Sequence, residues 1–190
     1  MIIVFARAPV PGHAKTRLIP RLGAWRAARL QARLTLAALR TARAARCGPV
    51  ELHGTSRHAF FEGKANFRLQ RGAHLGERMQ NAFRAALRRH RRVILIGSDC
   101  PVLRAADLRR AARWLQGGCD AVLAPAEDGG YALIGLRRLP PRLFDGIAWG
   151  GAEVYSTTVG RLGAARWRAL RTVWDVDRPA DLDRLQSVRF

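Results

Sequence analysis

Apolar residues gather in short runs without polar alternation at several places along the chain. The run at 93–96 is the clearest, because its residues are all aliphatic and Gly97 ends it. Such runs are too short for a helix and are typical of strands buried on both faces of a parallel sheet. We therefore expect strands at 2–6, 50–53, 67–70, 93–96, 119–124 and 169–174, with a further apolar run at 132–135.

Segments with helical periodicity lie between most of these runs. Within 25–46, for example, Leu30, Leu34 and Ala38 recur on one side of a helix and arginines on the other. Further helices are expected around 79–87, at 107–115, 140–144 and 152–162, and after Pro179, with Asp177 as the cap of the last. This alternation predicts an α/β fold with a Rossmann-like, doubly wound, mostly parallel sheet, as a single domain over residues 1–190.

The charge of the chain raises the question of a nucleic-acid partner. The formal net charge is +20, in a chain of 190 residues with 48% hydrophobic residues. Nearly all basic residues are arginines, since the lysines are Lys15 and Lys64, and Arg and Ala recur together throughout. We interpret the arginines within 25–46 as a solvated helix face, so nucleic acid is not an expected partner. The charge still favours anionic ligands.

Other features of the sequence concern the location of the protein. No apolar run approaches the ~20 residues that a membrane span needs. Residues 1–6 show neither a basic leader nor a cleavage site, which argues against a signal peptide. Cys47, Cys100 and Cys119 are odd in number and lack metal-binding spacing, so a reducing, cytoplasmic location is expected. The oligomeric state stays open.

Candidate chemistry begins at the end of the run 93–96. Gly97 ends this run, and Ser98 and Asp99 follow before Pro101, which cannot continue a strand ladder. Asp99 is therefore expected just beyond the carboxyl end of a central strand. This is the edge at which open α/β sheets place their ligands.

A basic loop follows the first expected strand. Residues 7–18 contain two prolines and Gly12, and they bring Lys15 and Arg17 close to the next helix. Cations and free backbone N–H groups in such a loop can hold phosphate. The loop is not a P-loop, because Lys15 follows alanine and the first glycine of that motif is missing. An ordinary basic loop explains the residues equally well.

The other acidic residues at strand ends have structural explanations too. Glu127 and Asp128 precede a glycine pair, which suits close approach to a ligand but also an ordinary hairpin turn. Glu77 fits the first turn of a helix, and Asp177 fits a helix cap. In the expected sheet, however, Asp99, 127–128 and 175–177 would meet at one edge. Separated carboxylates of this kind suit Mg²⁺ or Mn²⁺ together with a diphosphate.

The chain resembles a known bacterial family, the glycosyltransferase-A-like proteins of DUF2064, some of which are named arsenosugar-biosynthesis glycosyltransferases. Five ordered segments carry the resemblance, namely 5–18, 75–79, 96–101, 125–131 and 175–182. The family is similar to molybdenum-cofactor and phospholactate nucleotidyltransferases. The resemblance implies the nucleotide-diphospho-sugar transferase fold.

The resemblance also implies roles for individual residues. It assigns catalysis to Asp99, Glu127 and Asp128, and a divalent cation, Mg²⁺ or Mn²⁺, to Asp99 and Asp177. Nucleotide or phosphate binding is expected at Ala6, Arg7, Gly12, Lys15, Arg17, Gly76, Glu77 and Ser98, and acceptor or sugar binding at Gly129, Gly130, Tyr131 and Trp149. Three departures from the family pattern are His74, Arg104 and the pair Gly150–Gly151, of which the last concerns the acceptor pocket.

The leading hypothesis is a metal-dependent transferase that uses a nucleotide-activated donor, most simply a nucleotide-sugar-dependent glycosyltransferase with a small-molecule acceptor. An alternative is a nucleotidyltransferase that joins an NTP to a phosphorylated or carboxylate acceptor and releases pyrophosphate. A second alternative is a non-enzymatic basic module that binds nucleic acid.

Overall fold

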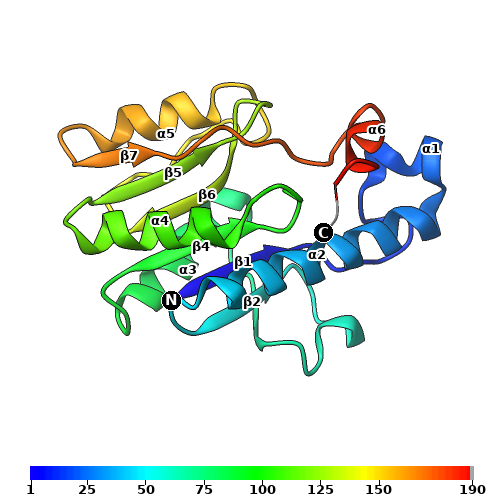
Figure 1. The fold of residues 1–190 in the computed structure, drawn as a ribbon, viewed down its shortest axis with the longest axis horizontal. Coiled ribbons are helices and arrows are strands. Elements are labelled where there is room, and N and C mark those ends of the chain that lie inside the picture. Colours follow the sequence, from blue (N-terminus) through cyan, green and yellow to red (C-terminus); the bar gives the residue numbers. More distant parts are fainter. Residues whose placement is uncertain (189–190) are drawn as a thin grey trace.

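The computed structural model describes residues 1–188, and its strands form one seven-stranded sheet in the order β3-β2-β1-β4-β6-β5-β7 (Figure 1). Strand β6 runs antiparallel to β4 and β5, and every other pairing is parallel. This confirms the expected α/β class and the mostly parallel sheet. The strands are β1 (Ile2–Ala6), β2 (Val50–Gly54), β3 (Asn66–Leu69), β4 (Val93–Gly97), β5 (Ala121–Pro125), β6 (Tyr131–Leu136) and β7 (Trp167–Ala169).

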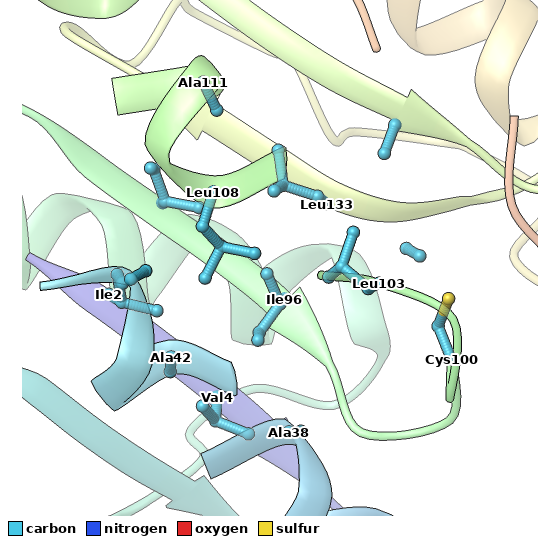
Figure 2. Packing of buried hydrophobic residues seen from close by; sticks show 14 of the residues in the cluster. Ile2, Val4, Ala38, Ala42, Ile96, Cys100, Leu103, Leu108, Ala111 and Leu133 are labelled. Carbon is cyan, nitrogen blue, oxygen red and sulfur yellow. The ribbon is translucent and has the colours of Figure 1, made fainter. Parts of the chain in front are cut away.

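Helices cover both faces of this sheet, which explains why its central strands lack polar alternation. Ile2 and Val4 of β1 pack with α2 and α4 on one face, whereas Ile3 and Phe5 pack with α3 on the other. Figure 2 shows the first of these two cores. The helices are η1 (Thr16–Leu18), α1 (Ile19–Leu22), α2 (Ala24–Ala45), η2 (Ala59–Phe61), α3 (Leu75–Leu87), α4 (Ala105–Gln116), α5 (Val154–Leu162) and α6 (Asp181–Leu185).

The direction of the strands decides where their ends meet. Because β4 and β5 are both antiparallel to β6, they run parallel to each other and to β1. Their carboxyl ends therefore share one edge of the sheet, and β6 begins at that edge after a tight turn at 127–130. The expected grouping of the loops that follow β1, β4 and β5 is thus present in the fold.

Two expected elements differ from the structure. The last strand is β7 (Trp167–Ala169) and not 169–174, because Val173 forms only an isolated bridge with Ala126. Residues 140–144 form turns and no helix, since Arg142 has a left-handed backbone, with φ of 57°, which a right-handed helix does not allow. Within residues 1–188, no helix is long and apolar enough to cross a membrane.

Candidate active site

Lys15 joins three loops at the carboxyl edge of the sheet. Its buried Nζ lies 2.7 Å from Asp99 Oδ1 and donates a hydrogen bond of 2.6 Å to the carbonyl oxygen of Val176. The backbone of Lys15 is left-handed, with φ of 49°. A non-glycine residue in this conformation is strained and needs surrounding structure to hold it. The basic loop is therefore shaped to place this one ammonium group between the segments that follow β4 and β7.

Asp99 is held in place by a buried polar network. Gln31 on α2, which is 2% exposed, donates from Nε2 to Ser98 Oγ at 3.0 Å, and this hydroxyl donates to Asp99 Oδ1 at 3.4 Å. The amide of Val176 donates to the carbonyl oxygen of Asp99 at 2.9 Å. Sequence reasoning placed Asp99 and Ser98 in the site but missed Gln31. The available signal was a glutamine within the apolar stripe of a helix.

Asp175 is the most perturbed carboxylate at this edge. Its Oδ1 is buried without a hydrogen-bond partner in residues 1–188. Burial, followed by the negative charges of Asp99 and Asp128, raises the pKa of Asp175 to about 7, and the charge of Asp177 acts in the same direction. Only Lys15 opposes this shift among the causes of that pKa. The structure thus brings four aspartates together, including one that sequence analysis did not select as a site residue.

Asp177 makes different contacts from those expected. Its Oδ2 lies 2.5 Å from a guanidinium nitrogen of Arg17, and both side chains are partly exposed. The expected capping role is wrong, because α6 begins only at Asp181. The carboxylate of Asp181 instead accepts hydrogen bonds from the amides of Asp177 and Arg178. Arg17 and Asp177 thereby link the loop after β1 to the segment before α6.

The two adjacent acids of the β5–β6 turn have separate environments. Glu127 makes a two-pronged ion pair with Arg184 of α6, at 2.7 and 3.0 Å, and this pairing lowers the pKa of Glu127. Asp128 Oδ1 accepts from the amide of Gly130 at 2.9 Å, and Asp128 lines a cavity beside the strand ends. Of these two acids, the structure brings only Asp128 to that cavity.

Gly129 has a packing requirement. Its φ is +88°, and a Cβ at this position would lie 2.0 Å from the carbonyl oxygen of Ala152. The carbonyl oxygen of Gly129 also accepts from the amide of Tyr155 at 2.8 Å. Gly129 therefore lets the β5–β6 turn rest directly against the segment that leads into α5, and this contact fixes one side of the cavity.

The cavity has a volume of about 200 Å³. Its walls include Phe5, Met79, Tyr131 and Trp149, and Asp175 lies among the lining residues. The hydroxyl of Tyr131 and Nε1 of Trp149 are buried without hydrogen-bond partners in the described part of the chain. Of the four residues expected to bind acceptor or sugar, Gly130, Tyr131 and Trp149 therefore line one cavity.

Gly76 and Glu77 build the start of α3, which forms another wall. A Cβ on Gly76 would lie 2.7 Å from Trp149 Nε1, so this position lets the indole pack against the helix. Glu77 Oε2 accepts from the amide of Ala73 at 2.8 Å, and His74 Nδ1 accepts from the amide of Glu77. His74, a departure from the family pattern, serves as the N-cap of α3. Phosphate binding at Gly76 and Glu77 remains a prediction.

The remaining residues expected to bind phosphate shape the basic loop. The carbonyl oxygen of Ala6 accepts hydrogen bonds from Thr55 and Gln70. Arg7 donates to the carbonyl oxygen of His13 at 3.3 Å, and Gly12 is exposed with φ of +83°. The side chain of Arg7 is exposed, and phosphate binding at Ala6, Arg7 and Gly12 remains a prediction.

The acidic cluster has the donor chemistry of an open metal site. Among residues 1–188, no group of three or more His, Cys, Asp or Glu side chains is arranged to hold a metal ion. Mg²⁺, however, needs only one or two protein carboxylates when waters and phosphates complete its shell. The unpartnered oxygen of Asp175 lies in the field of the Asp99 carboxylate. A divalent cation that uses few protein ligands therefore fits these residues, whereas a closed structural site does not.

Comparisons with known proteins agree with this fold. A family model described as "Uncharacterized protein conserved in bacteria (DUF2064)" matches residues 27–151. No curated protein sequence gives a significant match. The crystal structure of a Desulfovibrio desulfuricans G20 protein, proposed to be a nucleotide-diphospho-sugar transferase, matches with a TM-score of 0.89 and 34% identity, over 98% of this chain and 85% of that one.

Two more distant structures share the fold alone. Rv0371c from Mycobacterium tuberculosis H37Rv matches with a TM-score of 0.65 and 21% identity, over 98% of this chain and 97% of that one. CMP:2-keto-3-deoxy-manno-octonic acid synthetase in complex with CTP matches with a TM-score of 0.59 and 12% identity, over 98% of this chain and 96% of that one. These matches confirm the fold class that the sequence predicts.

Proposed function

The chain belongs to the bacterial family DUF2064, and from this premise we propose that it is a transferase that uses a nucleotide-activated donor, with a nucleotide sugar as the leading candidate. The similar Desulfovibrio protein, itself proposed to be a nucleotide-diphospho-sugar transferase, supports this choice. The finer assignment, glycosyl transfer with a divalent cation, depends on the chemistry of the site.

One observation carries the proposal, namely the grouping of charges at the carboxyl edge of the sheet. Asp99 and Asp175 come from different strand ends and influence each other electrostatically. Lys15 and Arg17 reach the same place from the loop after β1, each already paired with a carboxylate. An arrangement of this kind can accommodate a diphosphate together with a cation, because both signs of charge are available within one site.

We assign the divalent cation, Mg²⁺ or Mn²⁺, to Asp99 and Asp175, with Asp177 as a further ligand if Arg17 moves to the phosphates. When bound, the cation would neutralise charge on the donor diphosphate. Asp99 has a fixed position for this role, because Ser98 and Gln31 orient its carboxylate. Lys15 would exchange part of its contact with Asp99 for a phosphate oxygen.

Asp128 is the better placed of the two candidate bases. It lines the cavity, whereas Glu127 is bound to Arg184 through both carboxylate oxygens. We assign two tasks to the Asp128 carboxylate. It accepts a hydrogen bond from the acceptor hydroxyl, which orients this group, and it receives the hydroxyl proton as the new bond forms. Glu127 would act only after its ion pair with Arg184 opens.

Nucleotidyl transfer is the second candidate. CMP:2-keto-3-deoxy-manno-octonic acid synthetase shares the fold and was solved with CTP. Here the acceptor would attack the α-phosphate of an NTP, and pyrophosphate would leave. The grouping of Lys15, Asp99 and Asp175 suits either reaction, so the identity of the released product separates the two.

The test is a thermal-shift panel of nucleoside triphosphates, diphosphates and nucleotide sugars, each with and without Mn²⁺ or Mg²⁺. Manganese is included because Rv0371c, which shares the fold, was crystallised with it. We expect stabilisation by at least one nucleotide or nucleotide sugar that depends on the cation. Release of a nucleoside diphosphate supports glycosyl transfer, and release of pyrophosphate supports the second candidate.

Two variants make the panel specific. Asp99→Asn should abolish the cation-dependent shift with little change in size of the side chain. Glu62→Gln is the matched control, because Glu62 is exposed and its substitution also removes one negative charge. If no nucleotide stabilises the wild-type protein with either cation, or if Asp99→Asn behaves like the control, the proposed function is wrong.

A further inference from the structure

The cavity beside Asp128 has an unusual charge for this chain. The chain has a net charge of +20 and 34 lysines and arginines. Yet of the residues lining this cavity, all within the part of the chain that the structure describes, none is Lys, Arg or His. The charged residues in its lining are Asp128 and Asp175. This strongly basic chain therefore contains a small cavity whose lining residues provide no cationic side chain for an anion.

The rest of the lining is largely apolar. Phe5, Met79, Ile134 and Val154 contribute walls without any hydrogen-bonding side chain, and Trp149 adds an indole. The charged side chain that a ligand would meet is Asp128, whereas Oδ1 of Asp175, the hydroxyl of Tyr131 and Nε1 of Trp149 are buried in the walls. An ionised carboxylate accepts hydrogen bonds and does not donate them. A ligand in this cavity therefore presents a donor to Asp128 and an apolar body to the walls.

The cations near the site are already paired outside this cavity. Lys15 contacts Asp99 and the Val176 carbonyl, and Arg17 contacts Asp177. Arg184 is bound to Glu127 on the other side of the β5–β6 turn. Positive charge is therefore available where a donor diphosphate would lie, and not where an acceptor would lie.

We propose that the acceptor bound in this cavity is a small molecule with a hydroxyl or ammonium group on a compact apolar body, and that phosphorylated and carboxylate acceptors are excluded. This rests on the proposed function, and it deepens it by choosing between acceptor classes. Bringing an anion beside Asp128 would add like-charge repulsion inside a largely apolar cavity whose lining residues provide no cationic side chain. Nucleotidyl transfer to an anionic acceptor is therefore disfavoured.

The experiment uses four probes that share a phenyl body and differ in their polar end. They are 2-phenylethanol, 2-phenylethylamine, phenylacetate and phenyl phosphate, added to the full chain without nucleotide or metal. The readout is the indole N–H resonance of Trp149 in two-dimensional NMR, assigned by its loss in Trp149→Phe. The alcohol and the amine should shift this resonance at least about fivefold more, at equal concentration, than the two anions do.

A charge variant tests the cause of this preference. Asp128→Asn keeps the oxygen that accepts from the Gly130 amide but removes the charge, so discrimination between amine and phenylacetate should shrink several-fold. The exposed Glu62→Gln removes the same charge elsewhere and should leave the discrimination unchanged. Equal or larger shifts with the anions, no shift with the alcohol or amine, or unchanged discrimination in Asp128→Asn would each overturn the proposal.

This binding test is independent of the nucleotide panel. A protein that fails the panel but selects the alcohol and amine keeps its cavity assignment and loses the transferase proposal. A protein that passes the panel but binds the anionic probes keeps its transferase assignment and loses the acceptor class.

Discussion

Asp175 is the residue whose pKa reports most directly on the electrostatics of the candidate site. Its Oδ1 is buried without a hydrogen-bond partner in residues 1–188, and the carboxylates of Asp99 and Asp128 disfavour its ionisation. Folding therefore places this carboxyl where ionisation is unfavourable, because both burial and neighbouring charges disfavour the anion. Such residues are common at functional sites, where a ligand or cation supplies the missing interaction.

The raised pKa of Asp175, about 7 against an ordinary 3.8, predicts a pH-dependent gain in stability for Asp175→Asn. Below about pH 3 the wild-type carboxyl is protonated in both folded and unfolded states. Between about pH 4 and 7 the carboxyl ionises in the unfolded chain but stays protonated in the folded protein, so the wild type loses stability that the variant keeps, and this loss levels off above pH 7. The gain of the variant should grow from near zero at pH 4 to about 2–4 kcal/mol at pH 8.

Urea unfolding across this pH range, with EDTA present, measures the difference. Asp183→Asn is the matched control, since Asp183 is exposed and bound to Arg21, which lowers the pKa of Asp183. That variant should show no gain at high pH. A gain for Asp175→Asn that is independent of pH would show that its carboxyl is not strained by ionisation.

Site residues that follow the end of a strand could be predicted from the sequence. Site residues that reach the site only through the packing of helices and loops could not. Asp99 and Lys15 follow apolar runs, so the chain order alone places them at the ligand edge. Gln31 could not be linked to Ser98, because only the docking of α2 on the sheet joins them. Likewise, Asp175 and Asp177 look equivalent in sequence, and the folded structure separates them, because Asp175 is buried whereas Asp177 is partly exposed and paired with Arg17.

At the scale of elements, the two adjacent acids of the β5–β6 hairpin point to different surroundings. Glu127 pairs with Arg184 and so links the turn to α6, while Asp128 faces the cavity. Arg184 also lies over the ring of Trp174, at 4.4 Å from its centroid. The hairpin thereby holds the segment before α6 against the end of the sheet.

This arrangement predicts unequal effects for two matched substitutions. Glu127→Gln should leave the stability of the protein nearly unchanged, because the ion pair with Arg184 is half exposed to solvent. It should retain most of the transferase activity, whereas Asp128→Asn should lower kcat by about a hundredfold with a smaller change in KM for the donor. Steady-state kinetics on the donor found in the panel measures both. A larger kcat loss in Glu127→Gln than in Asp128→Asn would reverse the assignment of the base.

Strand positions could be predicted from the sequence wherever burial on both faces of the sheet produced uninterrupted apolar runs. Strands β1 and β4 were found for this reason, and the central helices for their periodicity. The last strand was placed too late, because β7 is a short edge strand that leaves little apolar signal around Trp167 and Ala169. Residues 140–144 form turns because the backbone of Arg142 is left-handed, and Phe144 at the end of this segment packs against Phe83.

For the whole molecule, net charge and local charge point to different partners. The excess of arginine gives the surface a positive field that favours anions such as nucleotides at long range. The carboxyl edge of the sheet concentrates aspartates instead, within a chain that has only 14 acidic residues. A cation held there would offset the charge of these aspartates and add to the positive charge that Lys15 and Arg17 provide for a diphosphate.

The most direct test of this account is Mn²⁺ binding followed by electron paramagnetic resonance, in the presence of the nucleotide selected by the panel. The wild type and Glu62→Gln should each remove Mn²⁺ from solution with similar affinity. Asp99→Asn should bind it at least about tenfold more weakly, since Asp99 is the fixed carboxylate of the cluster. Equal Mn²⁺ affinity in Asp99→Asn and the wild type would contradict the account.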